Sequence, residues 1–177
     1  MELSEALANK RKVILALWIE RTLDSYKSPG FFKQSKDPFA NPVGVNIANN
    51  LTTLFDLLLA NADQPAFLEA LDLVVHIRAV QEFAPSQALA PILELKWVVR
   101  QVFSANKETR PFLSLLDDLD CSIDRIALTA FDLYSACREQ LYQNRVRELK
   151  SGRAILTDTA CPSAVMRQER RETGTNN

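Results

Sequence analysis

The chain has 177 residues, with 21 basic and 22 acidic side chains and a formal net charge of -1. This balance provides no basic field for nucleic acid, and no apolar run approaches the roughly 20 residues that span a bilayer. Three cysteines, an odd number without a recognisable export signal, are typical of a reducing cytoplasm. The length predicts one domain with a sizeable core.

Glycine is scarce, and apolar residues recur at spacings of three and four, which predicts an all-α protein. A first helix is expected over about residues 4–26, with Ser4 as its N-cap. Its buried stripe would be Leu7, Ile14, Leu17 and Trp18. The proline-containing segment 29–44 predicts a structured loop or short turns. Three aromatic side chains are expected to hold this segment to the core: Phe31, Phe32 and Phe39.

Asn41-Pro42 predicts the start of the next helix, with Asn as cap and Pro at the first helical position. The buried face of this helix would be Ile47, Leu51, Leu54, Phe55 and Leu58. A further helix is expected from Asp63-Gln64-Pro65 to about Glu82, and another begins at Pro85. Pro91 falls inside that last helix, where a proline removes a hydrogen bond and costs on the order of 3 kcal/mol. We therefore expect a kink there or a broken first turn.

The final helix has the most regular pattern, and it is expected to reach Lys150. One apolar row steps by three and four, almost as a heptad, and Leu128 and Phe131 form a second row beside it. Two rows exceed what one core readily covers, so we expect a homodimer through this helix, either alone or together with the preceding one. The competing interpretation is that both rows are buried within one bundle. The candidate dimer face consists of Leu116, Leu119, Ile123, Ile126, Leu133 and Leu141.

Residues 151–177 differ from the rest, because they are polar and lack a period. We expect a domain over residues 1–150 followed by a disordered tail that is dispensable for folding.

Few residues suggest catalytic or metal chemistry. No glycine-rich phosphate loop is present, and the single histidine, His76, with scattered cysteines does not predict a zinc site. The alternatives for His76 are a haem ligand, a general base, a pH sensor or an ordinary helical histidine. Cys121 and Cys137 would lie roughly 24 Å apart along one helix, too far for a disulfide. The aspartates of the last helix start are expected to complement its positive end and stay solvated: Asp117, Asp118, Asp120 and Asp124.

Several polar residues lie within otherwise apolar helical sequence. A buried charge is tolerated only when it is paired, so they form either an interhelical network or the lining of a ligand cavity or partner surface. Arg78, among valines and isoleucine, is expected to be buried or half-buried and paired with Asp124 or Asp132. The full set is Arg78, Gln81, Glu82, Asp124, Arg125, Asp132 and Arg138.

Three runs carry a family resemblance: Asp-Pro-Phe-Ala-Asn-Pro-Val-Gly at 37–44, residues 77–88, and residues 124–134 followed by Cys137-Arg138-Glu139. In this order and spacing, over about residues 3–150, the chain resembles the N-terminal domain of the RsbT co-antagonist protein RsbRD. The resemblance implies a non-haem, globin-like bundle of five or six helices without catalytic role or cofactor. It also implies a cytoplasmic regulatory module in bacterial stress or signalling, acting through an unidentified protein partner. The alternative is a haem- or small-ligand-binding globin-like sensor.

Overall fold

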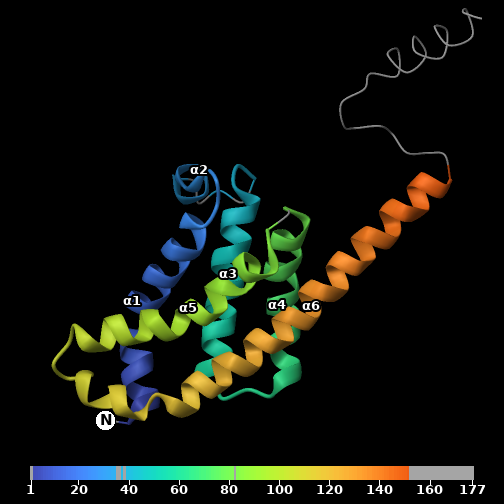
Figure 1. The fold of residues 1–177 in the computed structure, drawn as a ribbon. Helices are drawn as coiled ribbons and strands as arrows, with labels where there is room; N and C mark the ends of the chain where they lie inside the picture. The colour runs from blue at the N-terminus through green and yellow to red at the C-terminus, as the bar shows by residue number, and fades with distance from the viewer. Residues whose placement is uncertain (1, 35–36, 38, 82, 152–177) are drawn as a thin grey trace, which may run out of the picture. The chain divides into compact units, whose positions relative to one another are not determined.

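The computed structural model describes residues 2–34, 37, 39–81 and 83–151. Within them the chain forms six α-helices and one 3-10 helix and no strand, which confirms the all-α prediction (Figure 1). The chain divides into two compact units, residues 1–139 and residues from 140 on. Glu82, Cys161 and the predicted tail from residue 152 lie outside the described residues, so the tail and the boundary at residue 150 stay predictions.

The helices follow the predicted order with two corrections at the N-terminal end. The first helix begins directly after Glu2, so Ser4 is not its cap. A short helix also occupies part of the segment expected to be a loop or short turns. The elements are α1 (Leu3–Asp24), α2 (Pro29–Gln34), α3 (Pro42–Leu59), α4 (Gln64–Val80), α5 (Pro85–Ser104), η1 (Arg110–Leu115) and α6 (Asp117–Lys150).

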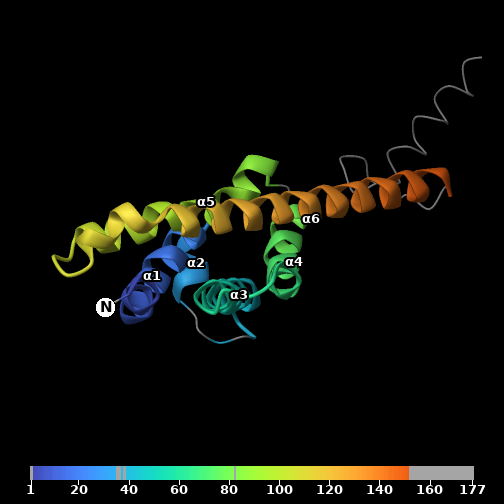
Figure 2. The same cartoon turned by 90° about the horizontal axis from the view of Figure 1, so that it is seen from below.

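The core of the first unit is built around α1, which packs against both α3 and α5, while α3 packs against α4 (Figures 1 and 2). Trp18 of α1 is fully buried, and its indole N–H donates to the Pro91 carbonyl at 2.6 Å. Each fully buried apolar side chain of this kind contributes about 1.5–3 kcal/mol. None of the described helices is long and apolar enough to cross a membrane.

The start of α3 is fixed by the predicted Asn41-Pro42 pair. The Asn41 side chain accepts a hydrogen bond from the Gly44 N–H at 2.9 Å and donates to the Phe32 carbonyl at 2.6 Å. A Cβ atom on Gly44 would lie 2.7 Å from that carbonyl oxygen, so the position requires glycine. Of the three phenylalanines expected to hold this segment, only Phe32 packs against the core, whereas Phe31 and Phe39 are exposed, Phe39 at 97%.

Pro91 lies inside α5 without breaking it. The helix runs from Pro85 to Ser104, and the proline is buried. Because Pro91 has no N–H, the Gln87 carbonyl lacks its usual donor four residues along the helix. Arg78 of α4 donates to this carbonyl at 2.9 Å. A side chain from another helix thus replaces the missing backbone hydrogen bond, and the first turn of α5 stays joined to the rest.

Candidate functional site

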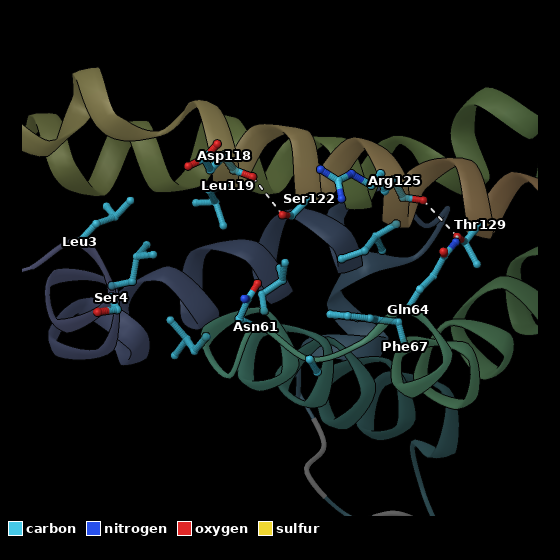
Figure 3. A pocket seen from close by; sticks show the side chains of 15 residues that line it. Leu3, Ser4, Asn61, Gln64, Phe67, Asp118, Leu119, Ser122, Arg125 and Thr129 are labelled. Carbon is cyan, nitrogen blue, oxygen red and sulfur yellow. Dashed lines mark hydrogen bonds between the residues drawn. The ribbon is translucent and has the colours of Figure 1, made fainter.

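A pocket opens in the first unit between the start of α1, the end of α3, the start of α4 and one side of α6 (Figure 3). Its volume is about 340 Å³. One wall is mainly apolar and comes from α1, α3 and α4, including Leu3, Leu7, Leu58, Leu59 and Phe67. The opposite wall is α6, with Asp118, Leu119, Ser122, Arg125, Ile126 and Thr129.

The α6 wall carries a polar stripe because residues 118, 122, 125 and 129 are spaced by three or four and share one helix face. The Ser122 hydroxyl donates to the Asp118 carbonyl at 2.9 Å, and the Thr129 hydroxyl donates to the Arg125 carbonyl at 3.0 Å (Figure 3). Gln64 of α4 donates to the Thr129 hydroxyl at 2.9 Å and so links the two walls. These hydroxyls are therefore already satisfied within the protein.

Arg125 differs from its neighbours in this stripe. Among the described residues its guanidinium has neither a hydrogen bond nor an ion pair, and the residue is exposed at the pocket. Asp118 lies in the first turn of α6, where the helix N-terminus compensates its charge. Arg125 sits two turns further along and receives no such compensation. The pocket thus offers one uncommitted cation beside an apolar wall.

Arg78 is fully buried, as the sequence predicted, but its partners are not the predicted ones. Its guanidinium donates to the Ser25 hydroxyl and the Gln87 carbonyl, both at 2.9 Å. It also lies 4.2 Å from the centre of the Phe83 ring. Nε and one terminal nitrogen have no hydrogen-bond partner in the described part of the chain, and burial lowers the pKa of the group.

The predicted ion pair between Arg78 and Asp124 or Asp132 is wrong. Asp124 instead accepts from Lys96 of α5 at 2.5 Å, and Asp132 is exposed. The Arg78 side chain reaches the residue that follows α1 and the first turn of α5. The buried cation is therefore stabilised by a hydroxyl, a carbonyl and aromatic rings in place of a carboxylate.

The other embedded polar residues do not converge on one network. Gln81 is exposed at the C-terminal end of α4, and Glu82 lies outside the described residues. Arg138 of α6 donates to the Ala79 carbonyl at 3.2 Å, which satisfies an acceptor in the last turn of α4. Of these embedded polar residues, Arg125 is the one that belongs to the described lining of the pocket. The sequence did not reveal the pocket, because its lining comes from four helices distant in the chain.

Comparison with known protein families gives a match for this chain. The family model described as the RsbT co-antagonist protein rsbRD N-terminal domain matches residues 12–149. The chain belongs to this family. The matched range contains the α6 wall of the pocket, and the family is one of stressosome-related regulatory domains. No curated protein and no solved structure gave a match, so the globin-like description of this rsbRD N-terminal domain stays a prediction.

His76 lies on the exposed side of α4 in this rsbRD N-terminal domain and does not line the pocket. Its Nδ1 atom is 3.4 Å from the Cys137 sulfur. Burial raises the pKa of that thiol. Cys121 and Cys137 are both free, as predicted from their separation along α6. Within the described residues no group of three or more histidine, cysteine or acidic side chains could hold a metal ion.

The pairing of α5 with α6 is set by two ion pairs across antiparallel helices. Lys96 pairs with Asp124, and Arg100 donates to Asp120 at 3.0 Å. The Arg100 guanidinium holds the pKa of the Asp120 carboxyl below its usual range. Two of the four aspartates expected to stay solvated are therefore paired.

Within the first unit, four large apolar side chains of these two helices are exposed. We call them the α5–α6 patch: Leu93, Trp97, Leu128 and Phe131. Leu128 is 67% exposed and Phe131 47% exposed. By contrast, four members of the candidate dimer face are buried in the core of the chain itself, namely Leu116, Leu119, Ile123 and Ile126.

Proposed function

We propose that this rsbRD N-terminal domain is a non-enzymatic regulatory module that acts through protein–protein contacts in bacterial stress or signalling, with a second copy as its first partner. The observation that carries the proposal is the α5–α6 patch. Contiguous exposed apolar surface on a folded domain usually marks an interaction site. A reducing cytoplasm, expected from the cysteine content, is part of the same proposal.

The register of the two helices supports a continuous patch. Leu93 lies one turn before Lys96, and Leu128 lies one turn after Asp124, so the ion pair places both leucines at the same level of the antiparallel pair. Phe131 continues the patch by about one turn of α6. Two copies meeting through this face would form a symmetric seam of four helices.

The buried row of α6 determines which side of the helix faces the core, and the ion pairs to α5 fit the same rotation. Since Asp120 and Asp124 are engaged by α5, α6 cannot rotate to bury Leu128 without breaking both pairs. The buried row of α6 supplies the core, and the second row supplies the proposed interface. Leu133 is half-buried beside this row, and Leu141, also half-buried, belongs to the second unit.

Sedimentation velocity tests this proposal. We expect the wild type to be a dimer at roughly 10 micromolar and above, corresponding to a Kd near 1 micromolar or below. Leu128→Asp and Phe131→Asp should each shift it to monomer without loss of helical content. Leu68→Asp is the matched control, because Leu68 is an exposed leucine of α4, away from the patch. A wild type that sediments as a monomer at these concentrations would contradict the dimer.

The pocket favours a second candidate function, that of a small-ligand sensor. Its volume and largely apolar wall are typical of ligand sites. The haem form of this candidate receives no support from the lining, since neither His76 nor a cysteine contributes to it. An organic ligand is the form that the pocket supports.

A further inference from the structure

We infer that the pocket between α6 and the apolar wall of α1, α3 and α4 binds a small organic anion, with an apolar body against that wall and its negative group at Arg125. The inference does not depend on the proposed dimer, because the α5–α6 patch and the pocket share no residue.

The apolar part of the ligand follows from the wall that it would contact. Leu7 and Phe67 are almost completely buried in the protein core and reach the pocket with their remaining surface, while Leu58 is half-buried. A volume of about 340 Å³ lies at the lower end of the range for small-molecule sites. The pocket therefore suits an aromatic body of up to three rings.

The polar part follows from what each polar group already does. Ser122 and Thr129 donate to carbonyls of their own helix, and Gln64 donates to Thr129, so these groups give the ligand no strong anchor. Arg125 alone in the stripe keeps its full set of side-chain donors. A guanidinium presents a planar fork that matches carboxylate and sulfonate oxygens.

The sign of the ligand charge is decided by comparing Arg125 with Asp118, the acidic residue of the lining. The N-terminus of α6 compensates Asp118, whereas Arg125 has no neighbouring carboxylate bonded to it among the described residues. Arg125 is therefore the charged group of the lining that is left to pair with a ligand, which favours an anion over an ammonium compound of the same shape.

A matched pair of fluorescent probes tests both parts. 8-Anilinonaphthalene-1-sulfonate carries the anionic group, and N-phenyl-1-naphthylamine is the same ring system without it. We expect saturable binding of the sulfonate at one site per chain. Arg125→Ala should weaken the sulfonate about tenfold, which is about 1.4 kcal/mol, and change the neutral probe less than twofold. Arg125→Lys should restore part of the loss, and Arg147→Ala, an arginine further along α6, is the matched control.

A pocket-filling variant locates the probe. Ser122→Phe places a ring inside the pocket and should abolish binding of both probes while circular dichroism stays unchanged. If this variant loses helicity, Thr129→Phe fills the same space from two turns further along α6. Leu128→Asp, on the α5–α6 patch, should leave binding intact.

Three results would overturn the inference. Binding that survives a folded pocket-filling variant places the probe elsewhere. If Leu128→Asp loses probe binding and the pocket-filling variants keep it, the probe binds at the α5–α6 patch. If Arg125→Ala weakens the charged and the neutral probe equally, Arg125 does not recognise the negative group of the ligand.

Discussion

Arg78 and Pro91 should be energetically coupled, although they lie on different helices. Arg78 donates to the Gln87 carbonyl that Pro91 leaves without a backbone donor. In Pro91→Ala, the new N–H can make that hydrogen bond within α5. Replacing Arg78 with methionine, which keeps much of the apolar contact, should therefore cost less in the Pro91→Ala background than in the wild type.

The size of the coupling can be bounded from the contacts. A hydrogen bond from a charged donor contributes about 1.5–3 kcal/mol, and a buried acceptor left unsatisfied costs about 1–3 kcal/mol. Replacing Arg78 leaves no carboxylate without its partner. It also removes a buried cation that has no ion pair, which offsets part of the lost stability. These effects occur both with Pro91 in α5 and in the Pro91→Ala background. Only when Pro91 is present does Arg78→Met leave the Gln87 carbonyl without a donor. We expect Arg78→Met to cost about 1–2 kcal/mol less in the Pro91→Ala background.

Urea unfolding of the wild type, the two single variants and the double variant, followed by circular dichroism, measures the coupling. Arg138→Met is the control arginine, because Arg138 donates to Ala79 of α4 and not to α5. Its effect should add to that of Pro91→Ala within about 0.5 kcal/mol. If the cost of Arg78→Met is equal in both backgrounds, Arg78 does not substitute for the missing backbone donor.

Three further predictions follow from local geometry and composition. Gly44→Ala should lower stability by more than about 1 kcal/mol in urea unfolding, whereas Gly30→Ala, whose added Cβ would meet no atom within 4 Å, should not destabilise. Asp120→Asn should cost about 1 kcal/mol or less at pH 7. The difference should shrink as the pH falls below the usual aspartate range and should vanish once the lowered pKa of the wild-type carboxyl is passed; Asp132→Asn, at an exposed aspartate of the same helix, is the comparison. Truncation after Lys150 should leave the melting temperature unchanged, and a drop of several degrees would refute this.

The helices themselves could be predicted from the sequence because their signals are local. Asn41-Pro42 carries both the cap and the first helical position of α3, and the spacing of apolar residues defines α6 to Lys150. The short α2 was missed because six residues are too few to show a period. Phe31 and Phe39 were placed wrongly because an aromatic residue in a loop carries no directional signal.

Burial or half-burial of Arg78 could also be predicted from the sequence, because the residue lies among Val74, Ile77 and Val80. Only the tertiary structure decided its partners, because a guanidinium can be satisfied by any acceptor within reach, and the acceptor here arises from a proline on another helix. Likewise, the two apolar rows of α6 were legible in the sequence. Which row is buried was decided by the packing of α6 against the core, because burying Leu119, Ile123 and Ile126 contributes more free energy than two partly exposed ion pairs to α5. The pocket exists only where another side of α6 faces three helices distant in the chain.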